Sequence, residues 1–331
     1  MLASTFMAAR ALVLLGCGWI ARRHAGAARR LGIPLLTASR DAGRARAFAR
    51  EFGAAAAFGS YEEATRDRRA AGAIVCTPHN RHLPDALMAL EAGLHVLVEK
   101  PIAPTLAEAD RMIGAADAAR RILMVAENVH FMPAFRHVQR LIAGGRLGEV
   151  RELHLVARGY RRQGGWRLDA GACGGGVLID GGIHHVHNLR RWGGEPRRVF
   201  ALVPPRTVAL GGEDAVDLLA ELPGGVVGFV ANSLGARGLP RVQWSTVTGT
   251  DGTCFADNRG RWVLLRGGRG TRLSLFFRDT RGHVAMLSAF DEAMRIGKTP
   301  ETDGADGRRD LAVVLAAYRS IAERRPVDIP C

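Results

Sequence analysis

The segment Ala11-Leu12-Val13-Leu14-Leu15-Gly16-Cys17-Gly18-Trp19-Ile20-Ala21 runs from a short apolar stretch into a G-x-G-x-x-A pattern. The apolar residues predict a buried strand, and the residues after the pattern predict a helix. In such a unit the first glycine permits a tight turn, the second lets the backbone approach a pyrophosphate, and the small third residue brings the helix against the strand. A tight turn without a ligand is the alternative. The residues that we expect at a bound dinucleotide are Gly16, Gly18, Trp19 and Ile20.

Short apolar runs continue to alternate with helical segments as far as residue 126. Further runs lie at residues 33–38, 73–76, 94–98 and 122–126, and helical periodicity marks residues 42–52 and 83–92. Strands that are apolar throughout are buried on both faces, and helical crossovers between them make them parallel. Residues 1–126 therefore predict an α/β dinucleotide-binding domain of Rossmann type, with a doubly wound parallel sheet.

The rest of the chain, residues 127–331, follows a different pattern. Turn residues such as Pro223-Gly224-Gly225 and Gly267-Gly268 separate strand-like runs at residues 150–158, 214–222, 226–232, 242–248 and 261–266. Strands joined by turns favour antiparallel pairing. Two helices, at about residues 282–296 and 306–323, close the chain, and the second can pack on either domain. We therefore predict an α+β second domain with a mostly antiparallel sheet.

Composition limits the possible function classes. A chain of 331 residues fits two domains of roughly 150 residues each. The net charge of +14 comes from arginines that are scattered along the chain, so we expect no nucleic-acid partner, although phosphorylated or acidic ligands would be attracted. Five widely spaced cysteines without a C-x-x-C pair, and no apolar stretch near about 18 residues, favour a cytoplasmic protein without a membrane segment. The apolar run before Cys17 is also shorter than a signal sequence needs.

The end of the second predicted strand bears on the choice of cofactor. A dinucleotide-binding unit for NAD places a carboxylate there, which accepts hydrogen bonds from the ribose hydroxyls. This chain has Ala38-Ser39-Arg40, and a hydroxyl followed by a guanidinium suits a 2′-phosphate. We therefore favour NADP over NAD. The alternative is that Arg40 is solvated while Asp41 caps the next helix and reaches the ribose of NAD.

Only two of the 46 basic residues are lysines, and one of them, Lys100, follows an apolar run in Glu99-Lys100-Pro101. Unlike a guanidinium, an ammonium can shift its pKa and take part in proton chemistry. A surface lysine retained by chance is the alternative. The position predicts an active-site residue.

A glycine-rich segment at residues 174–189 leads into a predicted helix that carries Asp180, His184 and His187. At a spacing of four, Asp180 can orient the imidazole of His184, which suits proton exchange near neutral pH. A helix cap with a packed histidine is the alternative. The three residues also lie on one helix face that could bind a metal, but no fourth ligand is apparent, and we predict no metal.

These motifs together resemble one family. Gly16-x-Gly18-x-x-Ala21, Cys76-Thr77-Pro78-His79-Asn80-Arg81-His82, Glu99-Lys100-Pro101 and Asp180-x-Gly182-x-His184, in this order, are similar to the Gfo/Idh/MocA oxidoreductases, named for glucose-fructose oxidoreductase and inositol dehydrogenase. The likeness covers nearly the whole chain and includes Ala126-Glu127-Asn128, Leu147-Gly148-Glu149-Val150 and Gly249-Thr250-Asp251-Gly252-Thr253. It implies a Rossmann domain and a second domain that binds the substrate and whose open sheet forms the contact surface of a homodimer or homotetramer.

The resemblance also implies roles for particular residues. Lys100 would contact the nicotinamide ribose and the reacting oxygen, Asp180 would orient the substrate or the histidine, and His184 would be the general acid and base. The stretches that typically line the cofactor are matched by Thr77, Pro78, Asn80, His82 and Glu99. Two positions depart from the family: Ser39 replaces the acidic residue of NAD-using members, and His187 stands where many sugar-acting members have a second Asp.

The reaction that these features imply is reversible hydride transfer between C4 of a nicotinamide and a carbinol carbon of a sugar, polyol or related cyclic compound. Loops above strand ends usually define specificity, so we name His130, Arg162, Trp166 and Arg167 as substrate contacts, with ordinary packing as the alternative. We also expect Asp180, His184 and His187 to contact the substrate. Two other functions remain open: a glycosidase that uses a retained nicotinamide for a transient oxidation, and a dinucleotide-binding regulator without turnover.

Overall fold

The computed structural model describes residues 10–238, 242–268 and 270–330, and these residues group into two compact units. Unit 1 contains the residues up to 102 together with 107–126 and 283–305. Unit 2 contains residues 103–106, 127–282 and those from 306 onward. The second domain predicted for residues 127–331 is therefore interrupted, because residues 283–305 belong to unit 1.

Unit 1 is built on a parallel sheet, which confirms the predicted α/β architecture. All strand pairs in this sheet run in the same direction. Its strands are apolar and β1 is buried along its whole length, as expected for a sheet covered on both faces. In sheet order the strands are β3 (Ala56–Phe58), β2 (Leu35–Ala38), β1 (Ala11–Leu15), β4 (Ala70–Val75), β5 (His95–Val98) and β6 (Leu123–Val125).

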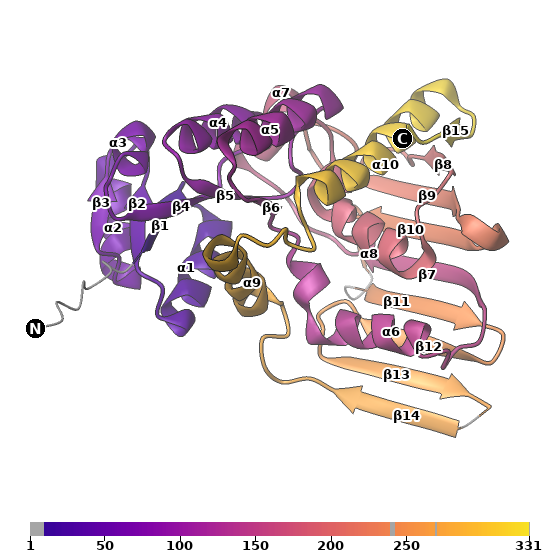
Figure 1. The fold of residues 1–331 in the computed structure, drawn as a ribbon. Helices are drawn as coiled ribbons and strands as arrows, with labels where there is room; N and C mark the ends of the chain where they lie inside the picture. The colour runs from indigo at the N-terminus through magenta and orange to yellow at the C-terminus, as the bar shows by residue number, and fades with distance from the viewer. Residues whose placement is uncertain (1–9, 239–241, 269, 331) are drawn as a thin grey trace, which may run out of the picture. The chain divides into compact units, whose positions relative to one another are not determined.

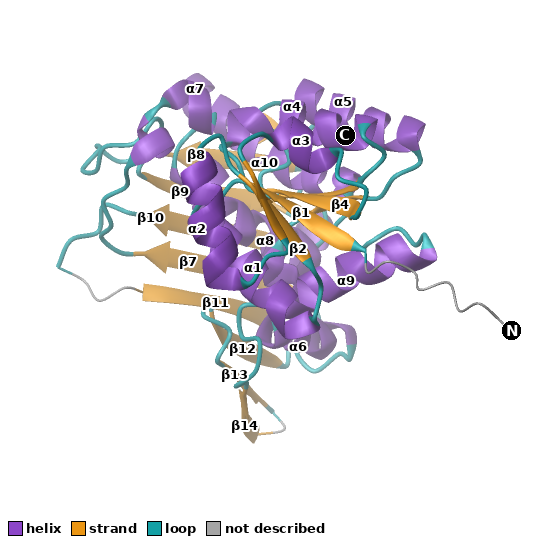
Figure 2. Cartoon of the chain, turned by 90° about the vertical axis from the view of Figure 1, so that its left-hand side faces the viewer, coloured by secondary structure: helices purple, strands orange, loops and turns teal. Residues whose placement is uncertain are grey.

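Helices lie on both faces of this sheet. The first two end at Gly32 and Gly53, which have positive φ angles of 68° and 71° and so close the helices with left-handed caps. Helices α1, α2 and α9 lie on one side of the sheet, and α3, α4 and α5 lie on the other (Figure 2). Their bounds are α1 (Trp19–Leu31), α2 (Ala42–Phe52), α3 (Tyr61–Thr65), α4 (His82–Glu91), α5 (Leu106–Ala119) and α9 (His283–Ile296), with a 3₁₀ turn η1 (His79–Arg81) before α4.

Unit 2 is built on a larger, mostly antiparallel sheet, as predicted. The exception is β7, which pairs parallel with β10. Among the described residues the sheet has nine strands. In sheet order they are β14 (Gly270–Leu275), β13 (Trp262–Gly267), β12 (Gly252–Asp257), β11 (Val242–Gly249), β7 (Val150–Arg158), β10 (Val227–Ser233), β9 (Ala215–Glu221), β8 (Arg198–Leu202) and β15 (Val327–Asp328).

Helices cover one face of the larger sheet (Figure 1). They bury every second residue of the strands beneath them, for example Leu153 and Leu155 of β7. The helices are α6 (Pro133–Ala143), α8 (Ile183–Gly193) and α10 (Gly304–Glu323), and the shorter elements are α7 (Ala170–Cys173), the 3₁₀ turns η2 (Asn128–Phe131), η3 (Gly165–Leu168) and η5 (Pro223–Gly225), and the π-helical turn η4 (Leu178–Gly182).

A row of mostly apolar side chains crosses the opposite face of this sheet. Residues that pair across neighbouring strands point to the same face. Leu219 and Leu273, near the two ends of the row, are 48% and 56% exposed. The row consists of Phe200, Leu219, Phe229, His154, Thr246, Phe255, Leu264 and Leu273, which are successive cross-strand partners.

No helix in the described part of the chain is both long enough and apolar enough to cross a lipid bilayer.

Candidate functional site

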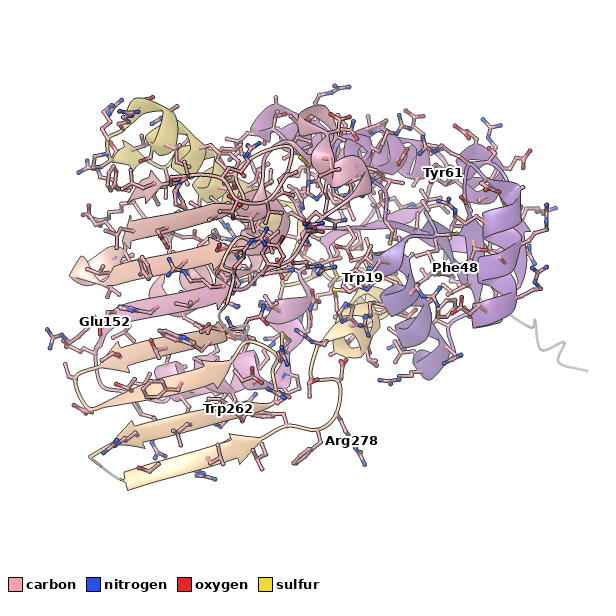
Figure 3. The ribbon with its side chains drawn as sticks, turned by 180° about the vertical axis from the view of Figure 1, so that it is seen from behind. Trp19, Phe48, Tyr61, Glu152, Trp262 and Arg278 are labelled. Carbon is pink, nitrogen blue, oxygen red and sulfur yellow. The ribbon has the colours of Figure 1, made fainter. Side chains whose placement is uncertain are left out.

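The glycine loop between β1 and α1 forms a cradle for an anion. Gly16 has φ 101°, and a Cβ there would lie 3.0 Å from the carbonyl oxygen of Cys76. Gly18 precedes α1 in an extended conformation, and a Cβ there would meet no atom within 4 Å. The space beside Gly18 is therefore open at the first turn of α1, where the N–H groups of a helix have no partner within the helix. Trp19, at the start of α1, is 63% exposed (Figure 3).

Thr77, which follows β4, adds a polar group beside this loop. A Cβ at Gly16 would lie 3.7 Å from the Thr77 methyl carbon, so the two positions are adjacent. The Thr77 hydroxyl is buried and has no hydrogen-bond partner among the described residues. Buried hydroxyls are normally paired. The cradle and this hydroxyl both fit the phosphate and ribose oxygens of a dinucleotide. Of the neighbouring residues predicted to line the cofactor, Pro78 is partly exposed and Asn80 is exposed.

The end of β2 presents the residues that bear on cofactor choice. Ser39 is buried, and its Oγ accepts a hydrogen bond from the backbone N–H of Asp41 at 3.3 Å. Arg40 is exposed. The Asp41 carboxylate accepts from the N–H of Arg44 at 3.0 Å and so caps α2. This hydrogen bond lowers the pKa of Asp41. The cap predicted in the alternative interpretation of Asp41 is thus present.

Glu99, predicted to line the cofactor, makes its main contact inside unit 1. Its Oε1 lies 2.7 Å from Nε2 of His24 in α1, and both side chains are buried. Burial alone would raise the pKa of Glu99, but the hydrogen bond and charge of His24 lower it overall. Its Oε2 accepts from the backbone N–H of Lys100 at 3.3 Å. Glu99 therefore ties the backbone of Lys100 to helix α1. Sequence analysis did not identify His24.

The side chain of His82 also contacts backbone carbonyl oxygens and does not face solvent. Its side chain has no exposed surface. Its Nδ1 lies 2.8 Å from the carbonyl oxygen of Pro101, and its Nε2 lies 3.0 Å from that of Thr77. Burial lowers the pKa of His82. Each ring nitrogen thus lies at hydrogen-bond distance from a carbonyl oxygen, one of which accepts from the neutral ring, and His82 links the loop after β4 to the loop after β5. His82 would therefore contribute to cofactor binding by positioning these two loops.

In unit 2, Tyr318 and Glu213 fix the glycine-rich approach to α8. A Cβ on Gly175 would collide with the Tyr318 hydroxyl, and one on Gly176 would collide with the backbone of Glu213. The hydroxyl accepts from the N–H groups of Gly176 and Ile179 at 3.1 and 3.2 Å. It donates to Oε1 of Glu213 at 3.1 Å. Burial raises the pKa of Glu213. These contacts hold the π-helical turn η4 in place.

Asp180 lies in η4, next to two other predicted site residues. Its Oδ2 accepts from Nε of Arg167 at 2.7 Å. The Arg167 guanidinium lies over the ring of Trp166, 4.4 Å from the centroid. The structure therefore brings Trp166, Arg167 and Asp180 together. Arg162, in contrast, is exposed and donates from Nε to the Tyr160 hydroxyl at 3.2 Å.

His184 is held by a carboxylate that sequence analysis did not select for this role. Nδ1 of His184 lies 2.5 Å from Oε1 of Glu127, which is buried and also accepts from the N–H of Val129 at 3.3 Å. The His184 side chain is 22% exposed. When Nδ1–H donates to the carboxylate, Nε2 of the neutral ring carries a lone pair and can take up a proton. The predicted pairing of Asp180 with His184 assumed regular α-helix between them, whereas Asp180 lies in the π-helical turn η4.

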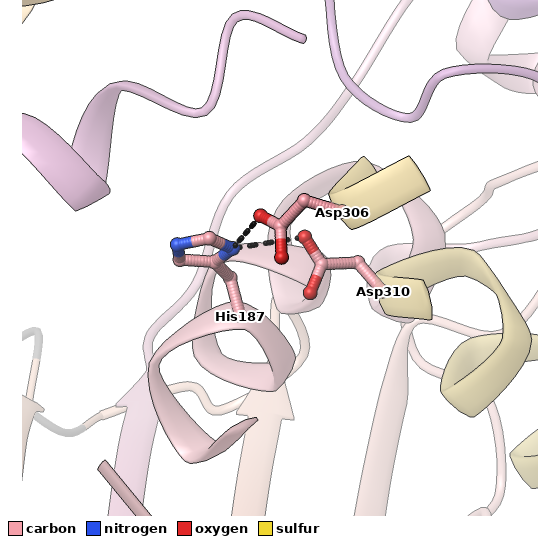
Figure 4. A group of neighbouring side chains, drawn as sticks. All are labelled: His187, Asp306 and Asp310. Carbon is pink, nitrogen blue, oxygen red and sulfur yellow. Dashed lines mark hydrogen bonds and ion pairs between the residues drawn. The ribbon is translucent and has the colours of Figure 1, made fainter. Parts of the chain in front are cut away.

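His187 lies one turn further along α8 and is completely buried. Its Nδ1 lies 2.9 Å from Oδ2 of Asp310 and 3.6 Å from Oδ2 of Asp306 (Figure 4). Its Nε2 lies 3.0 Å from Nδ1 of His130. His187 was predicted to contact the substrate directly. Its side chain has no exposed surface in this structure.

One group in the described residues has the geometry of a metal site, because ligand atoms of His187, Asp306 and Asp310 lie within 4.8 Å of one another. Arg190 bonds to both carboxylates, and Arg191 lies 3.2 Å from Asp306. Guanidinium groups therefore already neutralise the two acids. The metal face considered for Asp180, His184 and His187 is also in other use, since Asp180 binds Arg167 and His184 binds Glu127.

Comparison with protein families assigns both parts of the chain. Residues 10–127 match the oxidoreductase family with an NAD-binding Rossmann fold, and residues 135–255 match the GFO/IDH/MocA C-terminal domain.

Several curated relatives are similar to this chain. It is 30% identical to 1,5-anhydro-D-fructose reductase of Ensifer adhaerens and 29% identical to myo-inositol 2-dehydrogenase of Thermotoga maritima, in each case over 96% of this chain and 97% of the relative. It is 34% identical to mouse trans-1,2-dihydrobenzene-1,2-diol dehydrogenase over 66% of this chain and 64% of the relative.

Solved structures share the fold. Levoglucosan dehydrogenase in complex with NADH and levoglucosan superimposes with a TM-score of 0.87 at 21% identity, covering 96% of this chain and 98% of that one. Aldose-aldose oxidoreductase from Caulobacter crescentus, complexed with glycerol, has a TM-score of 0.87 at 24% identity, covering 96% and 99%. With the parallel sheet and glycine cradle of unit 1 and the open sheet of unit 2, these matches show that the chain belongs to the Gfo/Idh/MocA family and is an NAD(P)-dependent oxidoreductase.

Proposed function

We propose that the protein is a dehydrogenase or reductase that acts on a carbinol or carbonyl carbon of a cyclic polyol, sugar or related ring compound, with NADP preferred over NAD. The observation that carries this proposal is the pairing of His184 with Glu127 at 2.5 Å. A partly exposed imidazole whose Nδ1 binds a buried carboxylate is prepared to exchange a proton at Nε2.

Each side chain of the proposed site has its own role in the reaction. When bound, a nicotinamide supplies or accepts the hydride at C4. His184 removes the hydroxyl proton during oxidation and returns it during reduction, while Glu127 stabilises the imidazolium that forms in between. Lys100 offsets the negative charge that develops on the reacting oxygen. Asp180, held by Arg167 at 2.7 Å, orients the substrate.

The substrate class is supported by what the relatives are named for. Myo-inositol, 1,5-anhydro-D-fructose and trans-1,2-dihydrobenzene-1,2-diol are the compounds in the names of three relatives. Each is a ring that carries oxygen on neighbouring carbons. A ring compound with an oxidisable carbon beside a second hydroxyl is therefore the substrate class that we propose here.

The preference for NADP is supported by the end of β2. Arg40 is exposed there, and the residue before it is a serine, so no carboxylate stands at the position that would repel a 2′-phosphate. The next carboxylate along the chain, that of Asp41, caps α2.

We also propose that the protein forms a homodimer or homotetramer through the open face of the larger sheet. The row from Phe200 to Leu273 crosses eight strands on that face. Large exposed apolar patches on soluble proteins mark interaction sites. A second copy of the same sheet would cover this row with a matching row.

The test is a substrate screen with purified protein. Myo-inositol, trans-1,2-cyclohexanediol, aldoses and cyclic ketoses would be offered with NADP or NAD, and with the reduced cofactors, while the absorbance of the reduced nicotinamide is followed. Stoichiometric change with a ring polyol or sugar supports the proposal. Cleavage of a glycoside without net change in absorbance would establish the glycosidase instead, and cofactor binding without turnover of any compound would establish a regulator.

A further inference from the structure

A buried histidine of unit 1 contacts the carboxylate that precedes Lys100. Nε2 of His24 in α1 lies 2.7 Å from Oε1 of Glu99, and the other oxygen, Oε2, accepts from the backbone N–H of Lys100 at 3.3 Å. His24 and Glu99 are 0% and 6% exposed. One carboxylate, largely shielded from bulk water, therefore joins helix α1 to the backbone of Lys100.

The two ring nitrogens of His24 differ in their surroundings. Nε2 donates to the Glu99 carboxylate, because an ionised carboxylate only accepts. Nδ1 is buried and has no hydrogen-bond partner in the described part of the chain. A residue needed only for packing would be better replaced by an apolar side chain, which leaves no buried polar atom unpaired. The bond from Nε2 is therefore the reason that we assign for a histidine at this position.

The Glu99 carboxylate depends on this partner to remain ionised. Burial raises the pKa of Glu99, whereas the hydrogen bond and charge of His24, with the charges of Lys100 and His283, lower it overall. A buried carboxylate that loses its donor takes up a proton or turns toward water. Either change weakens the acceptor that Oε2 offers to the N–H of Lys100.

The backbone on either side of Lys100 is also held. The N–H of Glu99 donates to the carbonyl oxygen of Val75 in β4 at 3.0 Å. On the other side, Nδ1 of His82 lies 2.8 Å from the carbonyl oxygen of Pro101. Between these two attachments, the Glu99 carboxylate holds the peptide group that carries the Lys100 N–H.

We propose that His24 is a positioning residue that, through Glu99, holds Lys100 in register with a cofactor bound at the start of α1. Helix α1 begins at Trp19, directly after the glycine cradle, and His24 lies in the same helix. One helix therefore borders the expected pyrophosphate and carries the donor that fixes the Lys100 backbone. The role of Lys100 in the reaction rests on the proposed function; the coupling of His24 to the Lys100 backbone does not.

The two lysines of the chain make this coupling directly measurable. When the intact protein is labelled with ¹⁵N-lysine, its ¹H–¹⁵N spectrum contains one backbone signal for Lys100 and one for Lys298, and a Lys298→Arg variant assigns them. In the wild type we expect the Lys100 amide to exchange with solvent at least about tenfold more slowly than an unprotected amide. A Lys100 amide that exchanges at the unprotected rate would overturn the proposal without the need for any variant at residue 24.

Two substitutions of His24 separate positioning from packing. His24→Gln keeps an N–H group near the place of Nε2, whereas His24→Leu keeps the bulk and the helix propensity but removes the donor. We expect the Lys100 signal to stay close to that of the wild type in His24→Gln. In His24→Leu we expect it to shift and its exchange to become about tenfold faster.

A packing role predicts the reverse order of the two variants, because leucine leaves no buried polar atom unpaired. That reverse order, or equal behaviour of the two folded variants, would refute the proposal. His24→Met, which is also apolar, replaces His24→Leu if the branched side chain prevents folding.

His95→Gln is the matched control. His95 begins β5, the strand that Glu99 follows, so it lies at the opposite end of the strand. There its Nδ1 accepts from the N–H of Ile122 at 2.9 Å. This variant should change neither the Lys100 signal nor kcat.

Kinetics then connect the positioning to the reaction and separate it from the proposed function. Displacement of a group that acts only in the transition state lowers kcat and leaves KM and the dissociation constant of the cofactor unchanged. We expect kcat to fall by about 10- to 100-fold in His24→Leu and to stay within about threefold of the wild type in His24→Gln. If the Lys100 signal changes as expected but kcat does not, the link to the reaction is wrong. If no compound turns over, the proposed function fails, and the spectra still decide the coupling of His24 to Lys100.

Discussion

Oε1 of Glu127 lies 2.5 Å from Nδ1 of His184. Glu127 is the second residue after strand β6, and it holds the imidazole of His184 at the start of α8. Glu127 is 1% exposed. Its charge is therefore little screened by water, and it lies directly against the imidazole that we propose as the general acid and base.

Replacing Glu127 by glutamine should lower kcat by about 10- to 100-fold, the size of one charge-assisted hydrogen bond. The amide can still accept from Nδ1–H, but it does not carry the charge that stabilises an imidazolium. The dissociation constant of the cofactor should be unchanged, because Glu127 lies outside the glycine cradle. Measurement of kcat, cofactor affinity and melting temperature checks this prediction, and an unchanged kcat in a folded variant would show that Glu127 has no part in proton transfer.

Lys100→Ala and His184→Ala should each retain cofactor binding and lose turnover by roughly 10²- to 10⁴-fold, the usual effect of removing a group that handles a proton or developing charge. The chain contains its own control, since Lys298 is the second of only two lysines and is exposed. Lys298→Ala should behave like the wild type. Full turnover in both active-site variants would remove these residues from the mechanism.

Arg40→Ala should weaken NADP binding by about tenfold or more while leaving NAD binding nearly unchanged, because a charge-assisted bond to the 2′-phosphate contributes on this scale. Arg50→Ala, which removes an exposed arginine from the last turn of helix α2, the helix that follows Arg40, is the comparison. Fluorescence titration with both cofactors provides the constants. An equal loss of affinity for NADP and NAD would show that Arg40 does not bind the 2′-phosphate.

His185 should make the protein less stable in acid. Burial lowers its pKa from 6.5 to about 4. Between these two values the unfolded chain binds a proton that the folded chain does not, so the free energy of unfolding falls as pH drops through this window and levels off below it. A shift of this size corresponds to at most about 3 kcal/mol.

The measurement is urea unfolding of the wild type and His185→Gln at several pH values. Other histidines with lowered pKa values, such as His95, contribute in both proteins. The difference between the two proteins isolates His185, and it should shrink toward acid pH. A difference that does not vary with pH would contradict the prediction.

Phe229→Arg should dissociate a dimer or tetramer built on the open sheet face. Phe229 lies in the middle of the apolar row, paired with Leu219 on one side and His154 on the other. A charge there would have to be buried in the interface, which is costly without a partner. Sedimentation velocity checks the result against Ile296→Arg, an exposed apolar site at the end of α9 in the other unit. A wild-type protein that is already a monomer would end this proposal.

Local sequence patterns predicted most of the helices and strands. The helix at 42–52 and the strands at 11–15 and 150–158 have the predicted bounds. Strong periodicity and flanking glycines are local signals. Strands β3, β8, β12 and β14 were not among the predicted runs. Polar residues interrupt the apolar pattern of β12 and β14, β3 is short and rich in alanine, and the apolar residues 199–202 of β8 were not singled out.

The candidate site was predicted less completely, because its contacts are not local. Glu127 and His184 are 57 residues apart, and His24 and Glu99 are 75 apart. Only the fold brings these pairs together. Glu127 did carry a signal, since a carboxylate directly after an apolar strand is unusual, but it was noted only as a family landmark. The π-helical turn at Asp180 could not be predicted, because the spacing of its residues fits a regular α-helix equally well.

The contacts of Gly175 and Gly176 with Tyr318 and Glu213 also limit how this enzyme can be altered by selection. Any side chain at either glycine would displace the turn that presents Asp180, so libraries that diversify these positions would yield mostly inactive clones. Gly164, where an added Cβ would meet nothing within 4 Å, lies just before Trp166 and Arg167 and has no such restriction. New substrate preferences should therefore arise by variation around residue 164, while the glycine-rich segment stays invariant.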